Sequence, residues 1–263
     1  MNAFQIVQEI PTVGPELLFK IGGFPVSNGL LLSLAITVIL FLVSVALYRH
    51  RSLAPSKVQT VAELLYEGIA DLLDQITQSR AISKKILPLI GALVIYIGFA
   101  NIVTLLPGVG SITLGDVPLF RTPTSGINTT LALALAMVLL TQWVSIRDFG
   151  IVGHVGKYVQ IKEVFHGFHK SIGEGFIAII QFFVGLLDIV SELARVISLS
   201  LRLFGNMYAG EVLLVILMGA VAYAVPALWV GLSLFFGIVQ AVVFAALVAA
   251  YYTLAVKQKE INE

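Results

Sequence analysis

Apart from Glu174 near its start, five acidic or basic side chains lie within one long apolar stretch of the sequence, between residues 172 and 256. They are Asp188, Glu192, Arg195, Arg202 and Glu211. An ionisable side chain at the centre of a membrane helix costs about 2.5–3.5 kcal/mol on insertion scales, and such residues commonly mark ion paths or proton relays. Their number in one apolar segment therefore predicts a functional track rather than an accident of composition.

Spacing places most of the polar residues of this segment on one helix face. At about 100° per residue, the polar positions between 188 and 206 fall within a sector of roughly 80°. These positions are Asp188, Ser191, Arg195, Ser198, Arg202 and Asn206. Glu211 lies about 180° around the helix from Arg202 by the same arithmetic. The pattern favours two offset half-pores over one continuous pore.

A structural role is the alternative for part of this set. Asp188, Glu192 and Arg195 recur at helical spacing and could form a self-neutralising cluster, and Arg195 could extend toward water. Arg202 differs, because no acidic residue lies three or four positions from it. We therefore expect the partner of Arg202 to come from another segment or another chain.

The composition of the chain requires a membrane. Of its 263 residues, 58% are hydrophobic and 12% charged, with a mean hydropathy of +0.98, whereas soluble domains average about 25% charged residues. A bilayer is crossed by about 20 apolar residues, and the predicted spans are 28–48, 86–106, 127–146, 173–218 and 226–256. The prediction is an all-α integral membrane protein, one membrane domain over 1–263, with about five transmembrane helices. The last two form a long hairpin, tilted because each exceeds the bilayer thickness.

Charge distribution predicts the orientation of these spans. Twelve of the sixteen Lys and Arg residues lie in loops on one side, which is the cytoplasmic side by the positive-inside rule. We therefore expect the N-terminal segment 1–27 outside and the C-terminus in the cytoplasm. Residues 58–78 carry apolar side chains at steps of three and four, with acidic side chains on other faces. This predicts an amphipathic helix on the cytoplasmic surface, packed on neighbouring spans or, alternatively, bound to lipid.

The last predicted helix contains few polar residues. Gln240 lies near its midpoint and, in an antiparallel hairpin turning near Ala222, at about the depth of Arg202. It either hydrogen-bonds within the hairpin, lines a wet path beside Arg202, or does both. Tyr251 and Tyr252 fit an interfacial belt, and Tyr251 could also face the path. The chain has no cysteine, which excludes a cysteine metal site, and we expect no cofactor, no metal site and no nucleic-acid partner.

One segment of this hairpin resembles a known family. The stretch Ser198-Leu-Ser-Leu-Arg-Leu-Phe-Gly-Asn-Met-Tyr-Ala-Gly-Glu211 is similar to the signature of subunit a of the F-type ATP synthase. Three further segments agree in order, namely Asn101–Pro107, Pro123–Thr130 and Gln240–Phe244. The resemblance implies a non-catalytic stator subunit that couples ion flow, expected to be proton flow, to ATP synthesis. It implies as partners the c-subunit ring, peripheral-stalk b subunits, the rest of the synthase and the bilayer of a bacterial inner or thylakoid-type membrane.

The resemblance also implies roles for single residues. Arg202 resembles the essential stator arginine of the family, which faces the c-ring and separates two offset half-channels. Three positions match the outer half-channel, namely Asn206, Glu211 and Gln240. Four match the cytoplasmic half-channel, namely Ser198, Asp188, Ser191 and Arg195, and Tyr251 matches a further channel-side tyrosine.

The chain departs from the family pattern at two positions. Gly126 stands where many relatives carry an acidic residue, and Ser233 stands where some carry a histidine that pairs with the position of Glu211. Water and hydroxyl groups are then the candidate partners of Glu211. A secondary transporter, the competing class, would show inverted repeats and discontinuous helices, and no repeat is apparent. A purely structural scaffold would leave Arg202 unexplained.

Overall fold

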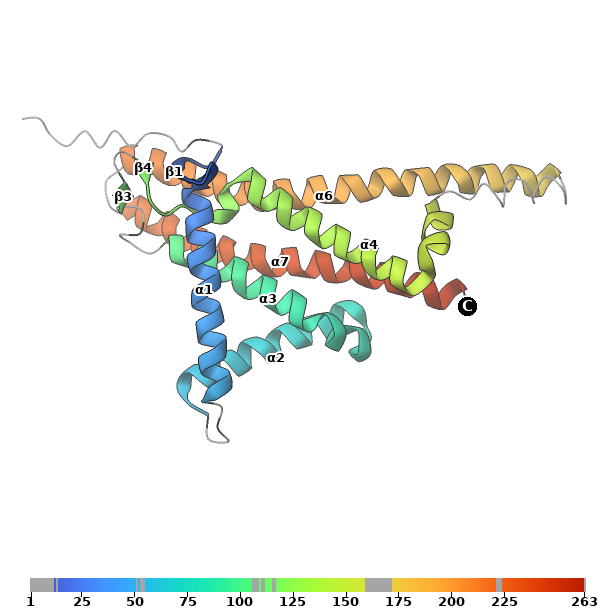
Figure 1. Ribbon diagram of the computed structural model, residues 1–263, viewed down its shortest axis with the longest axis horizontal. Coiled ribbons are helices and arrows are strands. Elements are labelled where there is room, and N and C mark those ends of the chain that lie inside the picture. The colour runs from blue at the N-terminus through green and yellow to red at the C-terminus, as the bar shows by residue number, and fades with distance from the viewer. Residues whose placement is uncertain are drawn as a thin grey trace, which may run out of the picture. The chain divides into compact units, whose positions relative to one another are not determined.

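The structure, a computed structural model, describes residues 12, 14–50, 52, 55–105, 109, 112–114, 117–158, 172–220 and 224–262. Its long helices are α1 (Asn28–Arg49), α2 (Lys57–Thr77), α3 (Arg80–Thr104), α4 (Ile127–Tyr158), α6 (Ile172–Ala220) and α7 (Ala224–Asn262) (Figure 1). Among the described residues, five segments are long and apolar enough to cross a bilayer, namely Asn28–Arg49, Arg80–Thr104, Ile127–Val144, Gly175–Gly219 and Val225–Thr253. The predicted helical membrane fold with five spans is therefore confirmed.

Several helices extend beyond the apolar runs that predict them. α3 begins at Arg80 rather than at residue 86, because the basic residues before its apolar run continue the helix. α4 runs on to Tyr158 through a kink at Gly150, whose φ is 71°. α6 contains 49 residues, which makes it about 73 Å long, more than twice the ~30 Å core of a bilayer. The predicted turn near Ala222 lies outside the described residues, as does most of 1–16.

Two small β-hairpins add to the predicted all-α fold. β1 (Leu17–Ile21) pairs antiparallel with β2 (Phe24–Ser27). Gly22 and Gly23 form their turn with φ values of 57° and 89°, a conformation that glycine adopts without the steric cost of a side chain. A second antiparallel pair, β3 (Thr113–Leu114) with β4 (Val117–Pro118), follows α3. These hairpins lie just before α1 and between α3 and α4.

The described residues cluster into two compact units. The first contains residues of 1–130 and 201–249, and the second contains residues of 131–200 and 250–263. In the second unit, buried apolar side chains come from three helices: Ala134 and Met137 of α4, Val196 and Leu199 of α6, and Tyr252 of α7.

The first unit is built on the packing of α1 against α3. Leu32 and Ile36 of α1 and Ala100 of α3 form a buried apolar cluster. A hydrogen bond of 2.7 Å joins the Ser33 and Tyr96 hydroxyl groups across the same two helices. The 3₁₀ turn η2 (Pro123–Ser125) also packs on both α1 and α3, so the loop that precedes α4 is held against the core of this unit.

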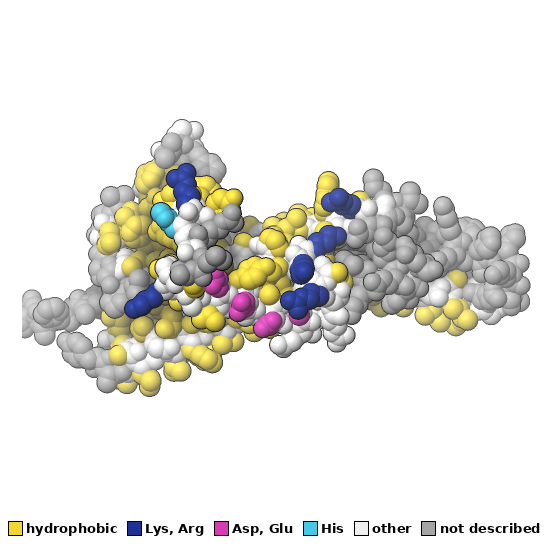
Figure 2. All heavy atoms as spheres, turned by 90° about the horizontal axis from the view of Figure 1, so that it is seen from below, with side chains coloured by type: hydrophobic (Ala, Val, Ile, Leu, Met, Phe, Trp, Pro, Cys, Tyr) yellow, Lys and Arg dark blue, Asp and Glu magenta, His cyan; other side chains and the backbone are white. Residues whose placement is uncertain are grey.

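The amphipathic helix α2 is packed along only half its length. Its second half lies on α3 and buries Ile69 and Leu73, which confirms the packing alternative there. Its first half leaves Val58, Val61 and Leu65 exposed. Figure 2 shows a row of acidic side chains on this face of the molecule, next to a group of Lys and Arg side chains. A lipid contact of the uncovered first half remains a prediction.

Candidate functional site on the last two helices

Arg202 is exposed on α6. Its neighbours one turn away on the same face, Ser198 and Asn206, are exposed as well, whereas Leu203, about 100° around the helix, is buried. Within the described part of the chain, no acidic side chain lies within ion-pairing distance of Arg202. The guanidinium therefore projects from an apolar span with its charge uncompensated by these residues.

One turn beyond Arg202, a polar contact joins α6 to α7. The Asn206 Nδ2 atom donates a hydrogen bond of 2.8 Å to the Gln240 Oε1 atom. Gln240 is only 3% exposed, and its Nε2 atom has no hydrogen-bond partner among the described residues. The predicted hydrogen bond within the hairpin is confirmed. A wet path at Gln240 remains a prediction, although an unpaired buried amide is the kind of group that an ordered water satisfies.

Glu211 has a partner that the sequence did not reveal. The Arg121 Nε atom donates to the Glu211 Oε2 atom at 3.3 Å, and Nη2 lies 3.3 Å from the same oxygen. The two side chains are 10% and 25% exposed, respectively. Glu211 is thus held by an arginine rather than by water and hydroxyl groups alone. The sequence did hold a signal, because Arg121 and Lys20 are the two basic residues that lie neither in the cytoplasmic loops nor in the apolar segment of Arg202.

The loop before α4 positions Arg121 through buried polar contacts. The Thr124 Oγ1 atom donates to the Asn101 Oδ1 atom at 2.8 Å, and the Asn101 Nδ2 atom donates to the Gly237 carbonyl at 3.2 Å. Thr124 and Asn101 are both buried. One asparagine therefore joins α3, the η2 turn and α7, and it fixes the turn that follows Arg121.

The α7 side of the hairpin lies close to the backbone of α6 beside Glu211. The Trp229 Nε1 atom donates to the Gly210 carbonyl at 3.1 Å. A Cβ atom built on Gly210 would lie 3.9 Å from the Ser233 hydroxyl. Ser233, which stands at the position of a histidine in some relatives, therefore borders the residue before Glu211, while the carboxylate itself is bonded to Arg121.

The predicted residues of the second unit form a separate group. The Arg195 Nη1 atom donates to the Glu192 Oε1 atom at 3.0 Å, so this part of the self-neutralising cluster is confirmed. The Arg195 guanidinium also lies over the Tyr251 ring, 4.5 Å from its centroid, a cation–π geometry. Tyr251 therefore contacts the polar face of α6. Asp188 is half-buried, whereas Ser191 is exposed.

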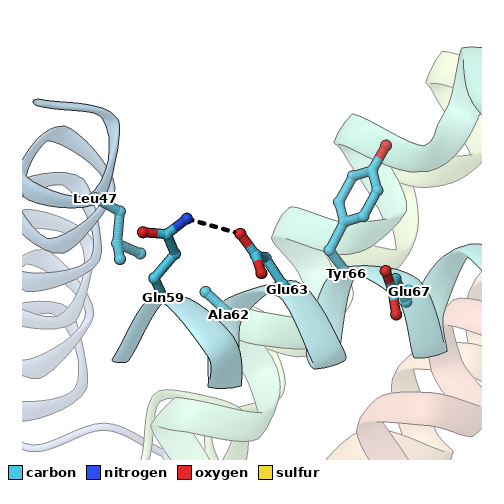
Figure 3. A pocket seen from close by; sticks show the side chains of 6 residues that line it. All are labelled: Leu47, Gln59, Ala62, Glu63, Tyr66 and Glu67. Carbon is cyan, nitrogen blue, oxygen red and sulfur yellow. Dashed lines mark hydrogen bonds between the residues drawn. The ribbon is translucent and has the colours of Figure 1, made fainter. Parts of the chain in front are cut away.

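A shallow hollow of about 310 Å³ lies between α1 and α2. Leu47, Gln59, Ala62, Glu63, Tyr66 and Glu67 line it (Figure 3). The Gln59 Nε2 atom donates to the Glu63 carboxylate at 2.8 Å, so these two polar side chains of the lining satisfy each other. None of the predicted site residues lines this hollow.

The fold and the site together define a class: a polytopic helical membrane protein whose longest span carries a positive charge that no described residue compensates. The sequence matches the family described as ATP synthase A chain over residues 30–253. It is 32% identical to ATP synthase subunit a of Desulforamulus reducens over 206 residues, 75% of this chain and 67% of that protein. It is 32% identical to ATP synthase subunit a of Desulfotalea psychrophila over 220 residues, 82% of this chain and 79% of that protein. ATP synthase subunit a 2 of a Picosynechococcus species is 28% identical over 248 residues, 93% of each chain.

The chain belongs to the ATP synthase A chain family, the ion-translocating stator subunits of F-type ATP synthases. It is accordingly an integral subunit of an energy-transducing membrane, and ATP chemistry takes place on other subunits of the complex.

Proposed function

We propose that Arg202 faces the c-ring and separates two half-channels through which protons reach and leave the ring. The observation that supports this most strongly is the exposed guanidinium of Arg202, which has no acidic partner in the described part of the chain. The family resemblance supplies a partner of the right chemistry, because each c-subunit carries one carboxylate within the membrane.

Electrostatics explain how such an arginine works. A carboxylate about 4 Å from Arg202 is stabilised by about 4 kcal/mol at an effective dielectric near 20, so it is held ionised while it faces the stator. Arginine keeps its own proton, and Arg202 therefore blocks direct proton transfer between the half-channels. A proton then crosses only while bound to a c-subunit carboxylate as the ring rotates. The membrane potential contributes ~2.3 kcal/mol per proton for each 100 mV.

The two half-channels are assigned to different residues. The outer half-channel comprises Asn206, Glu211 and Gln240, and the bond between Asn206 and Gln240 supports their joint placement. The cytoplasmic half-channel comprises Asp188, Ser191, Arg195, Ser198 and Tyr251, and the contact of Arg195 with Tyr251 supports that grouping. Net flow between them requires ring rotation, because Arg202 separates them.

Orientation and assembly complete the proposal. The excess of Lys and Arg in one set of loops supports an N-terminus outside and a C-terminus in the cytoplasm. With this topology Glu211 takes up protons from the outside. The subunit works as one membrane domain bound to the c-ring and to the peripheral-stalk b subunits.

The test replaces Arg202 with Ala in the complete synthase, reconstituted in vesicles. Loss of a pair of about 4 kcal/mol corresponds to about a thousandfold, so proton-driven ATP synthesis should fall to background. Arg80→Ala is the matched control, because the Arg80 side chain is 81% exposed and its ion pair with Asp74 is 3.8 Å long. Subunit content is checked on the purified complexes. Wild-type synthesis by Arg202→Ala would refute the proposal.

A further inference from the structure

Arg121 is a nearly buried cation that the proposed function leaves without a role. It comes from the loop between β4 and η2, and its side chain is 10% exposed. Beyond its two contacts with Glu211, the guanidinium is bonded to a third segment of the chain. The Nη2 atom donates to the Thr12 carbonyl at 2.8 Å, and the Nη1 atom donates to the Gly14 carbonyl at 3.0 Å.

These two carbonyl groups make Arg121 a fixed charge. Backbone carbonyls do not titrate, so they hold the guanidinium whether Glu211 is ionised or neutral. Arginine itself stays charged in proteins, and its planar fork can satisfy the two carbonyls and the carboxylate at once. Of the two members of the ion pair, only Glu211 can therefore change its charge and move away.

Arg121 is also the charged group that acts directly on Glu211 within the described residues. Thr122 and Ser125 from the same loop bring neutral hydroxyl groups to the carboxylate. α7 contributes neutral side chains beside Gly210, as described above. Glu16, the described acid of the N-terminal segment, accepts a hydrogen bond of 3.4 Å from the Thr12 hydroxyl.

We propose that Arg121 is a positioning residue for proton uptake: anchored to the N-terminal segment, it draws the Glu211 carboxylate back to one ionised position after each proton has passed inward. The inference rests on the proposed role of Glu211 in the outer half-channel. In each cycle a proton from outside binds a Glu211 oxygen and breaks the ion pair, while Arg121 keeps its two carbonyl partners. When the proton leaves toward the ring, the carboxylate pairs with Arg121 again.

The experiment measures ATP synthesis against outer pH in vesicles that contain the complete synthase. In Arg121→Gln, protonation of Glu211 no longer breaks an ion pair. The outer pH at half-maximal rate should therefore rise by about one to three units, the range by which a neighbouring arginine shifts a carboxyl group. Arg121→Lys keeps the charge, so its profile should stay close to that of the wild type. Arg80→Gln again serves as the exposed control.

An unchanged pH profile in Arg121→Gln would overturn the inference, and so would an equal shift in Arg121→Lys, because charge would then not be the cause. If the synthase with Arg121→Gln fails to assemble, the test rests on Arg121→Lys. A pH profile close to that of the wild type supports the proposal, and a shifted profile contradicts it. The variant Glu211→Gln distinguishes the proposed role of Glu211 from the proposed role of Arg121. If this variant transports protons at the wild-type rate, the proposed role of Glu211 fails. If it is slow while Arg121→Gln keeps the wild-type profile, only the inference about Arg121 fails.

Discussion

Substituting Gly237 with alanine tests how tightly α7 must pack on α3. A Cβ atom on Gly237 would lie 3.0 Å from the Cβ atom of Asn101, whereas carbon atoms in good contact are about 3.5–4.0 Å apart. Asn101 is buried and bonded on both sides, so it has little room to yield. α7 would have to move away, and with it Gln240, one turn further along.

The packing cost of Gly237→Ala, in the free energy of unfolding, can be measured with a matched pair of variants. Overpacking of this kind costs about 1–3 kcal/mol. A glycine-to-alanine change in a helix interior also gains about 0.8–1 kcal/mol of helix propensity, which obscures the packing cost in a single variant. Gly231 lies on the same helix with nothing within 4 Å of its would-be Cβ atom. Subtracting the effect of Gly231→Ala cancels the propensity gain, so Gly237→Ala should be less stable than Gly231→Ala by about 1–3 kcal/mol.

The assay is unfolding of the purified subunit by titration with a denaturing detergent, followed by ATP synthesis in reconstituted synthase. Gly98→Ala is a second control in the same interface, because its Cβ atom would lie 3.9 Å from that of Ala241, an ordinary contact. We expect Gly237→Ala to lose both stability and synthesis, and Gly98→Ala to keep both. Equal stability of Gly237→Ala and Gly231→Ala would show that the close approach of α3 and α7 is not as described.

Two further predictions concern the polar contacts of the hairpin. Asn206→Ala removes the donor to the buried Gln240 Oε1 atom and should cost about 1 kcal/mol, within the range of hydrogen bonds between membrane helices. Asn206→Ala combined with Gln240→Leu should recover stability, and an additive loss in this double-mutant cycle would argue against the bond. Tyr251→Phe keeps the ring beneath Arg195 and should match the wild type in the same unfolding assay. Tyr251→Leu should lose about 0.5–1 kcal/mol, and equal losses in both variants would rule out the cation–π contact.

Features that depend on local sequence were predictable. The five spans follow from apolar runs, which fix a membrane helix through length and composition alone. A hydrogen bond of Gln240 within the hairpin follows from antiparallel geometry, because residues at similar depth in a hairpin meet, although its partner Asn206 was identified only by the structure. Arg195 and Glu192 pair because residues three apart on a helix are neighbours. In each case helix geometry converts sequence spacing directly into distance in space.

The ion pair between Arg121 and Glu211 depends on the tertiary fold. The two residues are 90 positions apart, and their meeting depends on how the loop before α4 folds onto α3 and α7. That loop is held by Thr124 and Asn101, whose contact is itself long-range. Helical periodicity carries no information about such loops. The β1–β2 hairpin is different, since its Gly22–Gly23 turn is a recognisable sequence signal that a search for membrane spans passes over.

The central claim is that the face of α6 that carries Arg202 meets the c-ring. The chain contains no cysteine, so single cysteines can be placed without background. Ala209 lies two turns from Arg202 on the same exposed face, whereas Leu203 is buried. With one cysteine beside the c-subunit carboxylate, oxidation of the assembled synthase should link Ala209→Cys to a c-subunit and leave Leu203→Cys unlinked. A c-subunit link from Leu203→Cys, with none from Ala209→Cys, would contradict the claim.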